Sequence, residues 1–497
     1  NVNSDKKETL TSKLYKAAEK TTEFIKDNDD TVFCIIDKNK IKKIYPIKSK
    51  EYKNLLTFYL YQKHKKTINR KTMDDVLNNL EGRFSWLAGK EDVKARVSFT
   101  EESIEIDLGN DKWESIRIDK TGWAIGPHEA KLFRTKSMYP LPEPISDKNK
   151  LVLIKDLFRL SDDDYKLIVG WLIGCFMPKG PYPILILQGE QGSGKSTLAR
   201  VLRTIIDPSN TPTTSFPNKE QDLYIQARHN RILSYDNQRK LSNIHSDWLC
   251  RISTGGGYSN RKLYTDSDEI EMNYTRPIIL NGIHSIASQS DLISRAIIIN
   301  LTEISDSRMQ EKDLWQIFEE NKACMLGELC DGVVSVLNAH EPDIKLGRMA
   351  DFIIWVTKAE EAFGWDNNSF QKAYERNKKG AIQSRLEFDP LYVSIRRYFD
   401  DKPLEYVLDD TPTELFKLLQ HLNDEEHSLG SFPANVAAFS KKLMNLKPDF
   451  KQIGINICFI KSGNRRIKIE RIRTEEDGPA GEELKSGQEG QQGQQIS

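Results

Sequence analysis

The chain has 497 residues, with 73 Lys plus Arg and 73 Asp plus Glu, so its net charge is zero at pH 7. A domain usually has about 100 to 200 residues, so this length predicts about three or four domains. The neutral balance excludes a uniformly basic nucleic-acid binder, and the longest apolar stretch, Leu167 to Met177, is too short to span a membrane. The six cysteines form no C-x-x-C pair, so we expect reduced thiols in a cytoplasmic protein. The first residues form no signal-like segment, and we expect the chain to be a piece of a longer product.

Residues 1–80 are expected to form a basic, helical N-terminal region. From Lys38 to Lys71 there are 12 Lys and Arg but one acid, Glu51, and aromatic residues are interleaved with the cations. This pattern is typical of a surface that grips phosphates and stacks bases. It is equally typical of a solvated helix face whose aromatic side chains lie in the core.

Residues 81–145 are expected to form a small β-rich domain, which completes an N-terminal α+β part. Apolar residues alternate with period two from Val97 to Trp123, interrupted by Gly109-Asn110, and this pattern predicts a hairpin or small meander. A proline-rich run then precedes a helical stretch, Leu151 to Met177, and marks a domain boundary.

Residues 146–305 carry the alternation that is typical of an α/β fold with a parallel sheet. Helical segments separate four short apolar runs that read as strands: Ile184 to Leu187, Ile232 to Tyr235, Pro277 to Leu280 and Ala296 to Leu301. Residues 306–384 hold two long amphipathic stretches, 311–338 and 348–377, which predict a helical lid.

Residues 385–473 predict a winged-helix domain made of two helices and a hairpin. Thr411-Pro412-Thr413-Glu414 is a capping box that begins one helix, a second runs from Pro433 to about Leu446, and alternating residues from Ile453 to Ile469 form the hairpin. From Lys441 to Arg473 there are ten Lys and Arg against two acids. Residues 474–497, rich in Glu, Gly and Gln, are expected to be a disordered tail.

A phosphate-binding loop follows the first predicted strand of the parallel sheet. The segment fits G-x-x-x-x-G-K-[ST] at every fixed position, between an apolar strand and a helix that starts near Thr197. Lys195 would bridge the β- and γ-phosphates of ATP, and the Ser196 hydroxyl would ligate Mg²⁺. The predicted nucleotide-binding residues are Gly189, Glu190, Gln191, Gly192, Ser193, Gly194, Lys195, Ser196 and Thr197.

A second acidic element is expected one strand later, because the metal needs a carboxylate beyond the serine. Asp236 ends the strand that begins at Arg231, and we assign it as the metal carboxylate. Asn237 follows it, where many such ATPases carry a glutamate that activates water, and an amide orients water without taking its proton. Glu190 and Asp222 remain alternative carboxylates for that role.

Two further polar residues follow later strands. Asn281, at the end of the third strand, is predicted to sense the γ-phosphate and hold the attacking water, if this strand lies beside the P-loop strand. Arg295 comes directly before the fourth strand. It is either a surface cation or an arginine finger that reaches the γ-phosphate of a neighbouring subunit.

This order of motifs resembles that of AAA+ ATPases and, more narrowly, of superfamily 3 helicases of phages, plasmids and poxviruses. The resemblance rests on the helix from Leu167 to Gly174, on Thr254-Gly255-Gly256 followed by Arg261 and Leu263-Tyr264, and on Asn281, within about residues 167 to 301. Gly257 stands where the family has an aspartate after the paired glycines. Gly282-Ile283-His284 replaces the family's usual histidine-and-proline ending after the asparagine, so the chain resembles a divergent branch.

The resemblance implies an ATP- and Mg²⁺-dependent helicase that forms a homo-hexameric ring on single-stranded and forked DNA, with a primase domain or protein as a further partner. It also implies that the segment Tyr258 to Asn273 forms a hairpin in the channel. Arg261, Lys262 and Tyr264 of this hairpin would contact DNA, with a structural ion pair of Arg261 as the alternative. Lys441 and Lys442 would add contacts from the winged helix.

We therefore expect an ATP-dependent DNA helicase or translocase that replicates a phage, plasmid or other mobile element. The first alternative is an ATP-gated DNA-binding or remodelling ATPase, such as an initiator or defence protein, that does not unwind DNA; Asn237 favours it. The second is a scaffold whose P-loop binds nucleotide only to hold an oligomer together.

Overall fold

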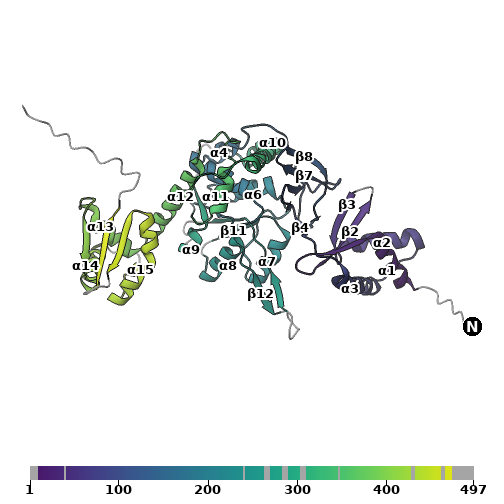
Figure 1. Ribbon diagram of the computed structural model, residues 1–497, viewed down its shortest axis with the longest axis horizontal. Helices are drawn as coiled ribbons and strands as arrows, with labels where there is room; N and C mark the ends of the chain where they lie inside the picture. Colours follow the sequence, from purple (N-terminus) through teal and green to yellow (C-terminus); the bar gives the residue numbers. More distant parts are fainter. Residues whose placement is uncertain are drawn as a thin grey trace, which may run out of the picture. The chain divides into compact units, whose positions relative to one another are not determined.

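The computed structural model describes residues 9–38, 41–238, 241–261, 269–282, 289–302, 309–344, 347–426, 431–460 and 465–472. The chain forms two compact units, residues 1–381 and 382–497 (Figure 1). The predicted disordered tail, 474–497, lies outside the described residues. None of the described helices is long and apolar enough to cross a membrane.

The first unit begins with three helices around a small antiparallel sheet. The helices are α1 (Leu10–Thr21), α2 (Lys50–His64) and α3 (Arg70–Leu87), and the strands are β1 (Glu23–Lys26), β2 (Val32–Lys38) and β3 (Ile41–Pro46), in the order β1-β2-β3. The helices expected in residues 1–80 are therefore present, but three strands that were not predicted accompany them. The apolar run of β2 is buried on both faces, so it lacks the alternation that identifies a strand.

The predicted β meander is confirmed. Strands β5 (Val97–Phe99), β6 (Ile104–Asp107), β7 (Glu114–Asp119) and β8 (Gly122–Pro127) pair antiparallel in chain order. Gly109 has a positive φ of 68° in the β6–β7 turn, a conformation that costs a glycine little. Two short strands, β4 (Lys94–Ala95) and β9 (Leu132–Phe133), pair parallel beside the meander.

The centre of the first unit is a parallel four-stranded sheet, as the sequence predicts. Its strands are β10 (Ile184–Gly189), β11 (Leu233–Gln238), β14 (Ile278–Gly282) and β15 (Ala296–Leu301), in the order β11-β14-β10-β15. The connecting helices are α6 (Lys195–Ile206), α7 (Glu220–His229), α8 (Asn243–Thr254) and α9 (Ser290–Ile293). Between α8 and β14, strands β12 (Tyr258–Arg261) and β13 (Glu269–Met272) pair antiparallel.

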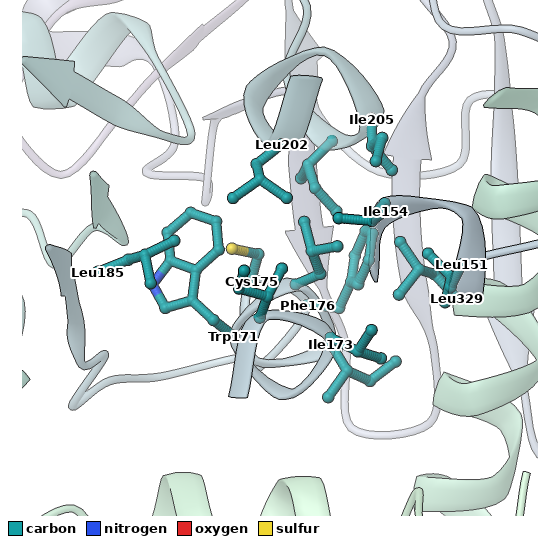
Figure 2. Packing of buried hydrophobic residues seen from close by; sticks show 14 of the residues in the cluster. Leu151, Ile154, Trp171, Ile173, Cys175, Phe176, Leu185, Leu202, Ile205 and Leu329 are labelled. Carbon is teal, nitrogen blue, oxygen red and sulfur yellow. The ribbon is translucent and has the colours of Figure 1, made fainter. Parts of the chain in front are cut away.

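The sheet is buried beneath a helical layer that includes α5 (Asp162–Gly174). Figure 2 shows Trp171, Cys175 and Phe176, at the end of α5, packed among Leu185 of β10 and Leu202 of α6. The helical stretch predicted from 151 to 177 is two helices, because Arg159 adopts a left-handed conformation after α4 (Val152–Phe158) and Ser161 caps α5.

The lid consists of α10 (Glu311–Asn338), α11 (Ala350–Thr357) and α12 (Ser369–Leu386). A Cβ on Gly170 of α5 would lie 2.2 Å from Phe370, and a Cβ on Gly174 would lie 2.4 Å from Phe352. The paired glycines therefore let both lid helices approach α5. The second lid stretch is not one helix, because the Glu360 carboxylate accepts the backbone N–H groups of Asn368 and Phe370 and starts α12 separately.

The second unit has the chain order helix, strand, helix, helix, strand, strand. These elements are α13 (Pro390–Asp400), β16 (Val407–Asp410), α14 (Pro412–Glu426), α15 (Val436–Gln452), β17 (Ile455–Ile460) and β18 (Arg466–Arg471), and the sheet order is β16-β18-β17. The predicted hairpin is confirmed, as is the cap of α14, where the Thr411 hydroxyl accepts the Glu414 N–H at 3.3 Å. The third strand, β16, was not predicted.

Candidate nucleotide site and basic surfaces

The P-loop joins the carboxyl end of β10 to α6. Gly192 and Gly194 have φ values of 88° and 84°, in the left-handed region that favours glycine. Gly189 has no room for a side chain, because a Cβ would lie 2.2 Å from the carbonyl oxygen of Leu301. No side chain among the described residues caps the start of α6, so its first N–H groups suit an anion.

The Lys195 ammonium folds back over the loop. Its Nζ donates to the Gly189 carbonyl at 2.9 Å and to Ser193 Oγ at 3.1 Å, and it also contacts the Glu190 carbonyl. Partial burial lowers the Lys195 pKa, and the nearby Asp236 carboxylate opposes this shift. The ammonium is held by weak neutral acceptors, so a phosphate oxygen is a better partner for it.

Ser196 and Asp236 come together as the sequence predicts for a metal pair. Ser196 Oγ donates to Asp236 Oδ1 at 3.1 Å, although the two residues lie on α6 and β11. Both are hard oxygen ligands of the kind that Mg²⁺ prefers. Thr197, also assigned to the nucleotide, accepts a bond from the Arg200 guanidinium at 3.3 Å.

Asn281 lies on β14, and β14 pairs directly with the P-loop strand, which confirms the expected position of this strand. Asn281 is 1% exposed, and its Oδ1 accepts the backbone N–H of Asn237 at 2.9 Å. Its Nδ2 is buried and donates to no described residue. A buried amide without an acceptor is costly, so this group is well placed for a ligand oxygen.

Asn237 has a φ of 54°, so the backbone turns sharply after Asp236. The Asn237 side chain is exposed. The two carboxylates considered for water activation are Glu190, on the P-loop, and Asp222, on α7, and both are exposed. Only these two side chains of the three can accept a proton, and the Asn237 amide can only orient water.

Sequence reasoning missed the segment that holds Asp236. Thr214 N donates to the Ser234 carbonyl, and Asp236 N donates to the Thr214 carbonyl, each at 3.0 Å. This segment therefore pairs with β11 and fixes the backbone that carries Asp236. No local pattern identifies it, because it makes an isolated bridge and not a strand.

Arg295 lies at the opposite edge of the sheet from the P-loop. Its carbonyl accepts the N–H of Ile184, the first residue of β10, whereas Gly189 pairs with Leu301 at the other end of β15. The strand length separates Arg295 from its own P-loop by roughly 20 Å. The guanidinium forms an ion pair with Asp291, which also binds Arg348 at 2.9 Å. A role at its own nucleotide is therefore excluded in this arrangement.

The expected hairpin between Tyr258 and Asn273 is confirmed as the antiparallel pair β12–β13, with Arg261 opposite Glu269 in the backbone register. Lys262 and Tyr264 lie outside the described residues, as does the side chain of Arg261. The DNA contacts predicted for these three residues stay predictions.

The second unit presents α15 and the β17–β18 hairpin around a groove of about 900 Å³, lined by Ser440, Met444 and Arg465 among others. Lys441 is exposed on α15, whereas Lys442 forms an ion pair with Asp389 at 2.9 Å. Lys441 is thus the better placed of the two lysines predicted to contact DNA.

The basic N-terminal segment, 38–71, has features of both interpretations that the sequence left open, an exposed surface of basic and aromatic side chains and a helix with aromatic side chains in the core. Tyr52 of α2 is buried against Thr22, while Phe58 is 60% exposed and Tyr61 is 52% exposed on the same helix. Lys53 forms an ion pair with Asp74 at 2.8 Å. Part of the segment is therefore core and part is an open surface of aromatic and basic side chains.

Comparison with known proteins points to a replication family. Residues 153–375 match the family model of the actinomycete integrative conjugative element replication protein. A search of curated proteins found no match.

Two solved structures of the NrS-1 C-terminal region, both apo, are also similar. The A form is 13% identical with a TM-score of 0.44, over 93% of this chain and 99% of that chain. The other is 13% identical with a TM-score of 0.39, over 94% of this chain and 100% of that chain. The match to the replication family runs from α4 into α12.

Proposed function

We propose that this protein is an ATP hydrolase that acts on DNA during replication of a mobile genetic element, as a ring-forming helicase or translocase. The observation that carries the proposal is the group of side chains at the carboxyl edge of the parallel sheet. Lys195, the Ser196–Asp236 pair and the unpartnered amide of Asn281 converge there from three adjacent elements. The similarity of residues 153–375 to a replication family supports the biological setting.

Each of these groups has a distinct part in phosphoryl transfer. Lys195 would bind the β- and γ-phosphates, and the P-loop N–H groups would hold their oxygens. Ser196 and Asp236 would hold Mg²⁺, which neutralises phosphate charge when bound. Asn281 Nδ2 would donate to the γ-phosphate or to the attacking water. These roles need positioning and charge more than a strong base, as expected for a loose transition state.

The assignments of an AAA+ core, a winged helix and an arginine finger rest on the order and position of the secondary-structure elements. The strand order β11-β14-β10-β15, with the P-loop strand between β14 and β15, supports an AAA+ core of the superfamily 3 type. The chain order of the second unit supports a winged helix. Arg295 lies at the edge opposite its own P-loop, where a ring would present it to a neighbouring subunit.

A second candidate is an ATP-gated DNA-binding protein that does not unwind, such as an initiator. The position of Asn237 favours it, because the residue after the metal carboxylate is an amide with an exposed side chain. Slow hydrolysis would suit a switch better than a motor.

Two assays on one preparation separate the candidates: the ATPase rate with and without single-stranded DNA, and displacement of a labelled strand from a fork. The helicase proposal expects DNA-stimulated hydrolysis and ATP-dependent displacement. Stimulation without displacement would favour the gated binder. ATP binding with no turnover under either condition would contradict both and leave a scaffold.

A further inference from the structure

A cavity of about 400 Å³ lies at the root of the β12–β13 hairpin, at the amino edge of the parallel sheet. It is lined by residues that precede the strands, with Arg231 before β11 and Arg276 before β14, and by Thr254 and Gly255 at the end of α8. Lys94 and Lys179 also line it. This volume suits a small ligand, and the cavity belongs to no part of the nucleotide site.

The two arginines are buried but have only neutral partners. Arg231 is 3% exposed and donates to the carbonyls of Cys175 and Met177 and to the Tyr182 hydroxyl. Arg276 is 8% exposed and donates to three carbonyls, those of Ala227, Asn230 and Thr275. No carboxylate among the described residues forms an ion pair with either guanidinium.

The buried Asp207 carboxylate makes several contacts in this region. It forms an ion pair with the buried Arg96 at 3.1 Å and accepts the backbone N–H groups of Arg231 and Ile232. Arg203, also buried, bonds the Asn230 side chain. Of the four buried guanidinium groups, only that of Arg96 forms an ion pair with Asp207 among the described residues, and a buried charge without a counter-ion is costly.

The charges at the cavity wall persist at neutral pH. Burial, reinforced by the Arg231 charge, lowers the pKa of Arg276 to about 10, so the group remains protonated at pH 7. At the rim, Lys94 forms an ion pair with Asp92 at 2.7 Å, and the Tyr274 hydroxyl donates to Asp29. Lys179 is exposed. The cavity wall therefore carries net positive charge.

We propose that this cavity is a phosphate-binding site, separate from the P-loop. Guanidinium groups suit phosphate because they offer several N–H donors in one plane, and neither Nη1 of Arg231 nor Nη2 of Arg276 donates to a described residue. The phosphate could come from a nucleic-acid backbone beside the hairpin or from free inorganic phosphate, and the chemistry of recognition is the same.

The test uses the full chain carrying Lys195→Ala, which weakens the P-loop as a competing phosphate site. The rise in Tm caused by millimolar inorganic phosphate, against chloride of equal ionic strength, is compared with the rise after Lys94→Gln and Lys179→Gln are added. A control adds Lys120→Gln and Lys148→Gln, two lysines remote in sequence from the cavity lining. We expect the rise to fall by about half or more in the cavity variant and to persist in the control. Lys94→Arg with Lys179→Arg should restore it.

A second arm identifies the source of the phosphate, through the affinity for a single-stranded oligonucleotide as a function of salt. If the ligand is the backbone, the cavity variant flattens the plot of log affinity against log salt by about 0.7 for each phosphate that the protein no longer neutralises. If the Tm response falls but the oligonucleotide plot does not change, free phosphate is the ligand. An equal Tm response in cavity and control variants, or no response in the Lys195→Ala chain, would overturn the proposal.

Discussion

The two edges of the parallel sheet carry opposite kinds of chemistry. The carboxyl edge offers backbone N–H groups, one ammonium and the oxygens of Ser196 and Asp236, all close to strand ends. The amino edge, roughly 17 Å away along buried strands, offers Arg231, Arg276 and Arg295 and the root of the hairpin. The carboxyl edge thus combines the groups proposed to bind a nucleotide, whereas the amino edge presents mainly guanidinium groups.

If the proposed function holds, this separation means that nucleotide chemistry at the carboxyl edge and DNA contact at the amino edge would use different side chains. Within one chain, an effect of the nucleotide on the amino edge would be transmitted through the strands or through the turn after Asp236. In that turn the Asn237 N–H donates to Asn281 Oδ1. Between chains of a ring, the amino edge of one subunit would face the carboxyl edge of the next. Substitutions at the two edges should therefore have separable effects.

The largest effect should come from Lys195→Ala at the carboxyl edge. Losing the ammonium removes the charge that binds the β- and γ-phosphates, and we expect ATP turnover to fall about 10³-fold or more. The measurement is phosphate release at saturating ATP, with Lys372→Ala, a lysine on α12, as the matched control. Turnover at the parental rate would remove the phosphate site from this loop.

Arg295→Ala should come next, with a loss of about 10³-fold if the residue acts as an arginine finger. Because Arg295 is far from its own P-loop, the loss should be relieved by a partner chain. Mixing Arg295→Ala chains with Lys195→Ala chains should restore part of the hydrolysis, since some interfaces then hold both intact residues. A mixture that co-assembles without any recovery would show that the ion pair with Asp291 is the residue's whole role.

Asp236→Asn should reduce Mg²⁺-dependent turnover about 100-fold, because the metal loses its carboxylate while Ser196 keeps a hydrogen-bond acceptor. Raising the Mg²⁺ concentration should recover part of the rate. A parental rate and parental Mg²⁺ dependence would place the metal carboxylate elsewhere.

A smaller effect is expected from Asn281→Asp, which keeps an oxygen for the Asn237 N–H but removes the unpartnered donor. We expect turnover to fall roughly 10- to 100-fold and ATP affinity to fall as well, because a hydrogen bond to a charged group is lost and the new carboxylate repels the γ-phosphate. Single-turnover kinetics with ATP-binding measurements separate the two quantities. Unchanged turnover would show that Nδ2 contacts neither the phosphate nor the water.

The sequence predicts the carboxyl edge far better than the amino edge. Asp236 and Asn281 each end an apolar run, and the carboxyl ends of parallel strands meet at one edge, so their convergence follows from the strand pattern. The cavity around Arg231 and Arg276 is assembled from segments far apart in sequence, and an arginine before a strand looks like any surface cation.

Local patterns also fail where tertiary contacts override them. Residues around Thr214 hold Asp236 without any strand pattern of their own, and β2 reads as a continuous apolar run because both of its faces are covered. For the glycines of α5, the sequence shows the pattern but not the tertiary contact that explains it. Their spacing is visible in the sequence, but its cause is the approach of Phe352 and Phe370 from the lid.

The smallest and most specific effect concerns the hairpin at the amino edge. Arg261→Ala with Lys262→Ala should abolish the stimulation of ATPase by single-stranded DNA, because the hairpin would couple the strand to the sheet. Lys441→Ala, on α15 of the second unit, should instead weaken DNA binding and flatten the salt plot by about 0.7, while stimulation at saturating DNA persists. Lys442 is the poorer probe, since its ion pair with Asp389 gives it a structural role. Stimulation that survives the hairpin change would make the hairpin structural, and the ATP-gated binder would then account better for the two separate edges.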